Sequence, residues 1–87
     1  MQIKLNYIGK EEKRLLRKIG VEIERNWKKK IYVISFPRTI KMMNVLNNLY
    51  FIETFDGVEL GQVWSPFDNN GGTLVLNLAN VRKLVEK

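Results

Sequence analysis

The segment Lys10–Ile19 separates its cationic from its apolar residues at the spacing of an α-helix. Five cations recur at intervals of three and four residues, which places them within one arc of a helix surface; they are Lys10, Lys13, Arg14, Arg17 and Lys18. Leu15, Leu16 and Ile19 occupy the opposite arc. The segment therefore predicts a helix that packs its apolar side against a sheet and exposes a row of cations.

Alternating residues on both sides of this helix predict a sheet for it to cover. Polar and apolar residues alternate over Gln2–Ile8 and again over Val21–Arg25, as they do in half-buried strands. Asn26–Lys30 then predicts a hairpin loop. Ile31–Phe36 is apolar on both faces, which is typical of a central strand, and Pro37 ends it.

The next segment has the spacing of a second amphipathic helix. Between Ile40 and Leu49 the apolar residues share one broad arc and the polar residues share the other. The apolar set is Met42, Met43, Val45, Leu46 and Leu49, and the polar set is Lys41, Asn44, Asn47 and Asn48. We therefore expect a helix here, with Thr39 as its N-cap.

The remaining residues predict strands and one short helix. Tyr50–Phe55 and Val58–Trp64 flank Asp56-Gly57, a pair that suits the type I′ turn of a hairpin. After this hairpin we expect a turn-rich loop, a strand and a short helix, at Ser65–Gly72, Thr73–Leu78 and Asn80–Lys87.

The order of these elements predicts an α+β fold. The first six, β-α-β-β-α-β, match a split, ferredoxin-like sandwich, to which a C-terminal β-hairpin and a short helix are added. A chain of 87 residues has too few residues for a second core, so we expect one small α+β domain over residues 1–87.

The net charge of +6 is unevenly distributed along the chain. Residues 1–48 contain twelve Lys and Arg against four Asp and Glu, whereas residues 49–71 contain four acidic residues and no basic one. Such polarity indicates an anionic partner. A lysine-rich surface can also serve solubility alone, and that alternative stays open at this point.

The two basic segments meet if the crossover between the first two strands is right-handed. Such a crossover makes those strands parallel, so the helix begins at the end of the sheet where the Asn26–Lys30 loop turns. We therefore expect a contiguous positive surface that binds the phosphates of DNA or RNA. Its expected residues are Lys10, Lys13, Arg14, Arg17, Lys18, Arg25, Trp27, Lys28, Lys29 and Lys30.

Trp27 has two alternative roles in this surface. An exposed indole among the lysines could stack on a base or a sugar. Alternatively, the indole folds back over the edge of the core, because it can bury a large apolar area. The sequence leaves both roles open.

Catalysis is not expected of this chain. It has neither His nor Cys, the commonest general base and the strongest nucleophile, and Ser35 and Ser65 lack the setting of a nucleophile. The loop that begins at Asp68 has Ala79 where a calcium loop needs glutamate, so no metal or cofactor is expected.

No apolar run approaches the roughly 18 residues of a membrane span, and Met1–Lys10 lacks the apolar segment of a signal peptide. We therefore expect a cytoplasmic protein without a membrane partner.

The hairpin 50–64 indicates an alternative function. It combines acidic and aromatic residues, namely Glu53, Asp56, Glu59, Tyr50, Phe51, Phe55 and Trp64. Aromatic side chains dominate the energetics of protein interfaces. The alternative is therefore a small protein-interaction or inhibitory module, of the kind found in phages and mobile elements, that acts through this hairpin.

Overall fold

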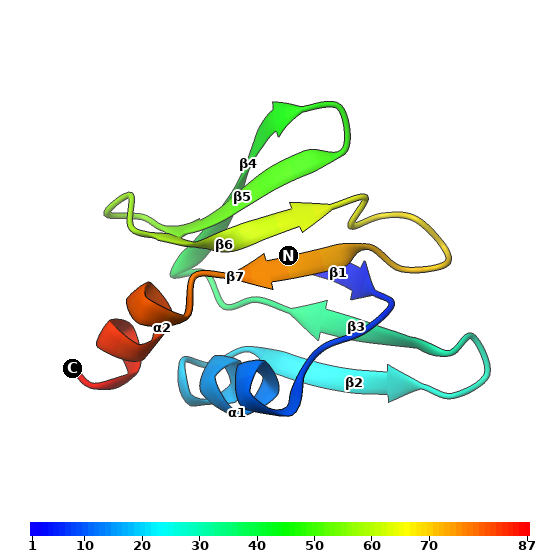
Figure 1. The fold of residues 1–87 in the computed structure, drawn as a ribbon, viewed down its shortest axis with the longest axis horizontal. Helices are drawn as coiled ribbons and strands as arrows, with labels where there is room; N and C mark the ends of the chain where they lie inside the picture. The colour runs from blue at the N-terminus through cyan, green and yellow to red at the C-terminus, as the bar shows by residue number, and fades with distance from the viewer.

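The computed structural model describes residues 1–87 as two helices and two antiparallel sheets, which confirms the α+β class (Figure 1). The elements in chain order are β1 (Gln2–Leu5), α1 (Lys10–Lys18), β2 (Glu22–Asn26), β3 (Ile31–Ser35), β4 (Ile40–Leu46), β5 (Leu49–Thr54), β6 (Glu59–Trp64), β7 (Thr73–Leu76) and α2 (Leu78–Val85). The first sheet has the strand order β1-β3-β2, and the second has the order β4-β5-β6-β7.

The first sheet forms as the sequence predicts. Strands β1 and β2 both pair antiparallel with β3, so they are parallel to each other, and α1 connects them. Ile3 of β1 and Ile23 of β2 lie opposite Ile34 of β3. Leu15 and Leu16 of α1 are buried in the same core as Ile3 and Ile34. The helix therefore covers one face of this sheet with its apolar side.

The second sheet has a buried inner face and a partly exposed outer face. Opposite residues on paired strands share a face, so Ile52 of β5 and Val63 of β6 are inner residues, buried with Val81 of α2. Helix α2 packs against both α1 and β6, and Figure 1 shows the two helices side by side at one end of the molecule. One continuous cluster of buried residues thus joins both sheets and both helices.

The loop between β6 and β7 joins the two sheets along the free edge of β1. The Lys4 N–H donates to the Pro66 carbonyl at 2.8 Å, and the Gly72 N–H donates to the Lys4 carbonyl at 2.8 Å. A side chain at Gly72 would not fit, because its Cβ would lie 2.2 Å from the Trp64 carbonyl oxygen. Gly71 has φ +85°, a conformation that residues with a side chain rarely adopt. The turn residues predicted here therefore form a close backbone seam.

The predicted helix between Ile40 and Leu49 is wrong, because Ile40–Leu46 is strand β4. Asn47 and Asn48 form a two-residue connection to β5, with Leu46 opposite Leu49 and Asn48 at φ 61°. Asparagine tolerates this left-handed conformation and favours turns over helix interiors. Methionine and leucine favour helices, but only by a few tenths of a kcal/mol per residue (~0.5), which pairing with β5 along the whole strand outweighs.

This strand also changes the wider fold assignment. Because the fifth element is a strand, the order β-α-β-β-α-β does not form, and the ferredoxin-like arrangement is not confirmed. The hairpin that follows has the predicted partners, but its turn is not type I′. That turn requires positive φ at both central residues. Gly57 has a positive φ, whereas Asp56 does not.

Candidate nucleic-acid interface

Four side chains from α1, β2, β3 and the β2–β3 turn form one continuous row of cations and aromatic rings. The Lys13 ammonium lies 5.1 Å from the centre of the Tyr32 ring, and the Arg25 guanidinium lies 4.4 Å from the same ring. Arg25 also lies 4.9 Å from the ring of Trp27. These separations are within the range of cation–π attraction. We call this set, Lys13, Tyr32, Arg25 and Trp27, the stacked row.

The register of the β2–β3 hairpin places the middle of this row. Arg25 and Tyr32 are directly opposite each other on paired strands, so their side chains share the sheet face that α1 covers. The Arg25 Nε atom is buried and has no hydrogen-bond partner. A buried donor without a partner costs stability. The contacts with the two aromatic rings therefore hold the guanidinium in place although its Nε makes no hydrogen bond.

Trp27 projects from the stacked row into solvent. It is 78% exposed, so it does not cover the edge of the core. Its turn is ordered by the side chain of Asn26, whose Oδ1 accepts a hydrogen bond from the Lys29 N–H at 3.0 Å. Lys30 completes the turn with φ 56°. An indole is therefore presented at a hairpin tip beside three exposed lysines, Lys28, Lys29 and Lys30.

The cations of α1 differ in how firmly they are held. Lys10, Arg14, Arg17 and Lys18 are exposed, and Lys13 is partly buried against Tyr32. Arg14 forms an ion pair with Glu11 over 2.5 Å. That hydrogen bond lowers the pKa of the Glu11 carboxyl and raises the pKa of Arg14. Arg17 donates from Nη2 to the Ile23 carbonyl of β2 at 3.3 Å.

These contacts divide the predicted basic surface into two sides. Lys13 and Arg17 contact β3 and β2, toward the stacked row. Arg14 and Lys18 instead line a shallow pocket of about 290 Å³ against α2, together with Arg82. The start of α1 lies toward the end of the first sheet where the β2–β3 turn projects (Figure 1). The structure thus brings Lys13 to Arg25 and Trp27, and it separates Arg14 and Lys18 from them.

Two residues of this surface are not among those that the sequence predicts for it. Tyr32 lies in a segment typical of an ordinary core strand, yet it contacts two cations. Its position opposite Arg25 follows from the hairpin register: Asn26 belongs to β2 and pairs with Ile31, whereas the predicted loop Asn26–Lys30 would have put Ile31 opposite Arg25. Arg82 joins the other side of the surface because α2 packs against α1, and no local sequence signal predicts that contact.

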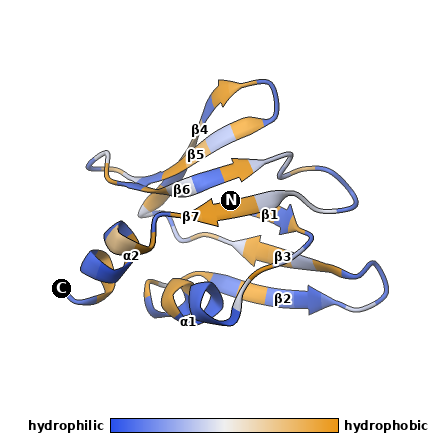
Figure 2. Cartoon of the chain, viewed as in Figure 1, coloured by the Kyte–Doolittle hydropathy of each residue, from blue (hydrophilic) through white to orange (hydrophobic).

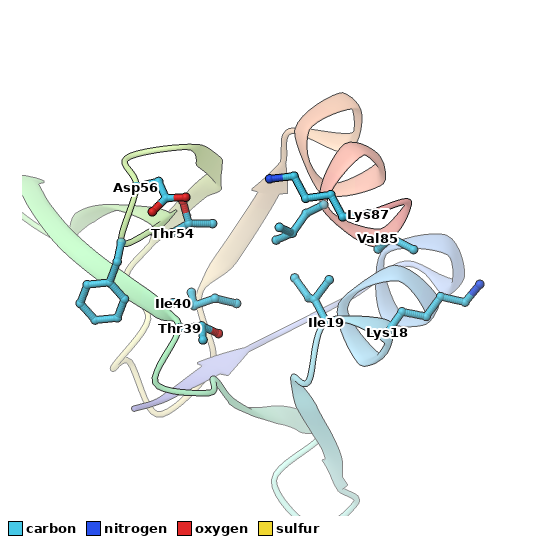
Figure 3. Close-up of a pocket in the computed structure, with 10 residues that line it drawn as sticks. Lys18, Ile19, Thr39, Ile40, Thr54, Asp56, Val85 and Lys87 are labelled. Carbon is cyan, nitrogen blue, oxygen red and sulfur yellow. The ribbon is translucent and has the colours of Figure 1, made fainter.

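A cleft of about 550 Å³ lies at the far end of α1 (Figure 3). Its walls come from the ends of both helices, the start of β4 and the β5–β6 turn. Apolar side chains such as Ile19, Ile40 and Val85 line it, with Lys18 and Asp56 among its charged residues. This volume is in the range of small-molecule sites.

No group of residues that could hold a metal ion is found in the structure.

The β5–β6 hairpin is less acidic at its surface than its sequence indicates. Glu53 is buried and pairs with Lys41 of β4, whose Nζ lies 3.5 Å from the carboxylate. Lys41 also lies 5.8 Å from the ring of Phe55, which is 65% exposed. Pairing with β4 therefore neutralises one of the three carboxylates that mark this hairpin.

No model of a known protein family, no curated protein sequence and no solved structure matches this chain. Neither helix is long and apolar enough to span a membrane. The functional assignment therefore rests on the residues and their geometry alone.

Proposed function

We propose that this protein is a non-catalytic cytoplasmic binder of nucleic-acid phosphates. The binding surface comprises the cations of α1 that face β2 and β3, the stacked row and the lysines of the β2–β3 turn. Neutralising phosphates with lysine and arginine releases condensed counterions, which drives binding without regard to sequence. Binding through phosphates positions a nucleic acid without specifying its bases.

The stacked row is the observation that supports this proposal best. A merely soluble basic surface would leave its cations separately solvated. Here Lys13 and Arg25 both contact the Tyr32 ring. Because these two side chains are already ordered, less side-chain entropy is lost when they bind a ligand. An exposed Trp27 beside this cluster is a further feature typical of nucleic-acid surfaces.

Fluorescence anisotropy with labelled DNA and RNA tests the proposal. If about five cations contact a duplex, the logarithm of the association constant should fall against the logarithm of salt concentration with a slope near −4 to −5. Simultaneous reversal of Lys13, Arg17 and Lys29 to Glu should weaken binding to every sequence about equally, by roughly 100-fold or more at low salt.

A matched variant separates local contacts from net charge. Reversing Arg38, Lys83 and Lys87 to Glu makes the same change in net charge away from the proposed surface. This control should weaken binding by less than about tenfold, since only the long-range field changes. Equal losses in the two variants, or no binding tighter than about 10⁻⁴ M at low salt, would reject the proposal.

A protein-interaction module is the second candidate function. The outer face of the second sheet exposes Met43 opposite Phe51, and Trp64 and Val75 on the neighbouring strands, which are 46% and 61% exposed. Exposed apolar side chains that gather on one face can mark an interaction site. A second copy of the chain is the simplest protein probe. This candidate predicts self-association in sedimentation equilibrium that a Trp64→Glu, Val75→Glu double variant loses. A wild-type chain that stays monomeric at its highest attainable concentration removes that support.

A further inference from the structure

The Trp27 indole has one ring face in contact with the protein and the other free. Arg25 lies over the ring at 4.9 Å, and the side chain as a whole is 78% exposed. Among the aromatic and cation–π contacts of the structure, Trp27 takes part only in this one. The opposite face of the ring is therefore open to solvent while the ring itself is held in place.

The support behind the indole extends into the body of the protein. Arg25 contacts the rings of both Trp27 and Tyr32, and Lys13 of α1 also contacts the Tyr32 ring. Helix α1 therefore supports the row from the body of the protein. The side chain of Asn26 fixes the turn through the Lys29 N–H. An exposed aromatic ring that is ordered before binding loses little conformational entropy when a ligand stacks on it.

The ring surroundings define the chemistry of the ligand. A flat, uncharged aromatic group suits the free face of the indole, and the neighbouring Lys28, Lys29 and Lys30 suit anionic groups on either side of it. A nucleobase between two phosphates combines both features. Bases inside a duplex are covered by their stacked neighbours, so only an unpaired base can offer a free face.

We infer that Trp27 is a stacking platform for one unpaired base, and that the surface prefers single-stranded over double-stranded nucleic acid. This inference rests on the proposed function, since the phosphate contacts bring the strand to the turn. Every base has an aromatic face, so stacking adds affinity without sequence specificity.

The test compares two labelled oligonucleotides of equal length and charge. One is oligothymidylate of about 8 nucleotides, and the other is an abasic sugar–phosphate oligomer of the same length. Both present the same phosphates, but only the first presents bases. Anisotropy at one low salt concentration should show oligothymidylate binding about 5- to 150-fold more tightly, as expected for one stacked base.

Two variants assign the difference to the indole. Trp27→Ala should bring the two affinities together by weakening oligothymidylate binding, with little change for the abasic oligomer. Trp64→Ala removes the other tryptophan, which lies on the second sheet without a cation over its ring, and should leave the ratio unchanged. A thermal melt of each variant confirms that it is folded. In a Trp64→Phe background, quenching of the remaining tryptophan fluorescence by oligothymidylate reports the stack directly.

The outcomes separate this inference from the proposed function. If both oligomers bind equally, or if Trp27→Ala leaves their ratio unchanged, the stacking inference is overturned and phosphate binding stands. If duplex of equal length binds as tightly as the single strand, the preference for unpaired bases is overturned. If neither oligomer nor duplex binds, both the inference and the proposed function fail.

Discussion

The two sheets place their aromatic side chains in different electrostatic surroundings. In the first sheet, Trp27 and Tyr32 both contact cations that belong to a basic surface. In the second sheet, Trp64 has no cation over its ring, and the lysine near Phe55 is already paired with Glu53. Figure 2 shows that the end of β2 is hydrophilic, whereas most of β7 is hydrophobic.

This difference shows how similar residues can serve different partners. An exposed indole among cations suits a ligand that is both aromatic and anionic. An exposed indole within an apolar sheet face suits another apolar surface. The neighbours of Trp27 and Trp64, and not the tryptophans themselves, therefore separate the proposed nucleic-acid surface from the second candidate interface.

The largest effect is expected at the seam between the two sheets. Gly72→Ala would place a Cβ 2.2 Å from the Trp64 carbonyl oxygen and 2.6 Å from the Ser65 carbonyl oxygen. Because both contacts are with backbone, the loop must move away from β1. We expect a loss of about 3 kcal/mol or more in unfolding free energy, or roughly 12–24 °C in the melting midpoint.

Gly57→Ala provides the control for that prediction. Gly57 also has a positive φ, but a Cβ there would meet nothing within 4 Å. Only the backbone strain remains, which costs about 1 kcal/mol. Calorimetry of both variants measures the difference. Equal midpoints for the two would show that the sheets are not held together by the close approach at Gly72.

A medium effect is expected where the second sheet pairs its charges. Glu53→Gln removes the anionic partner of Lys41, whose side chain is only 39% exposed. A partly buried cation is then left without its charge partner, so we expect a loss of about 1–2 kcal/mol by denaturant titration. In the first sheet, the exposed Glu22 has no ion-pair partner, and Glu22→Gln should change stability by less than about 0.5 kcal/mol. Similar losses in both variants would contradict this contrast between the sheets.

The sequence predicted the first sheet better than the second for a physical reason. In β1, α1 and β2, burial on one side imposes a period of two or 3.6 residues, and β3 is a short run that is apolar on both faces and ends before Pro37. Ile40–Leu49 fits a helical arc by its apolar spacing, yet it also alternates as a strand with Ile40 and Met42 facing inward. Pairing with β5 decides between the two patterns, and the turn residues Asn47 and Asn48 that allow this pairing also fit the polar arc of a helix.

The sequence predicted some parts of the candidate site and missed others. The cations of α1 and the β2–β3 turn follow from helix spacing and strand order. The stacked row depends on which strand residues lie opposite each other, and the spacing of residues along one strand does not specify this register. The exposure of Trp27 could not be decided either, because an indole is equally suited to a core edge and to a ligand.

The smallest predicted effect concerns Arg14, which Glu11 holds on the α2 side of α1, away from the proposed binding surface. The Arg14 hydrogen bond lowers the pKa of Glu11, so this carboxylate is charged at neutral pH and holds Arg14 across 2.5 Å. Glu11→Gln should release Arg14 and raise affinity for a duplex about two- to threefold, with the salt slope steeper by less than about 0.9. Lowering the pH through the lowered pKa of Glu11 should have the same effect on wild type, and it should also remove the small stabilisation that the ionised pair provides.

Anisotropy at two salt concentrations measures the change in affinity, with Glu22→Gln as a control of equal charge on the edge of the first sheet. If the control raises affinity as much as Glu11→Gln, the gain comes from net charge and Arg14 does not contact the nucleic acid.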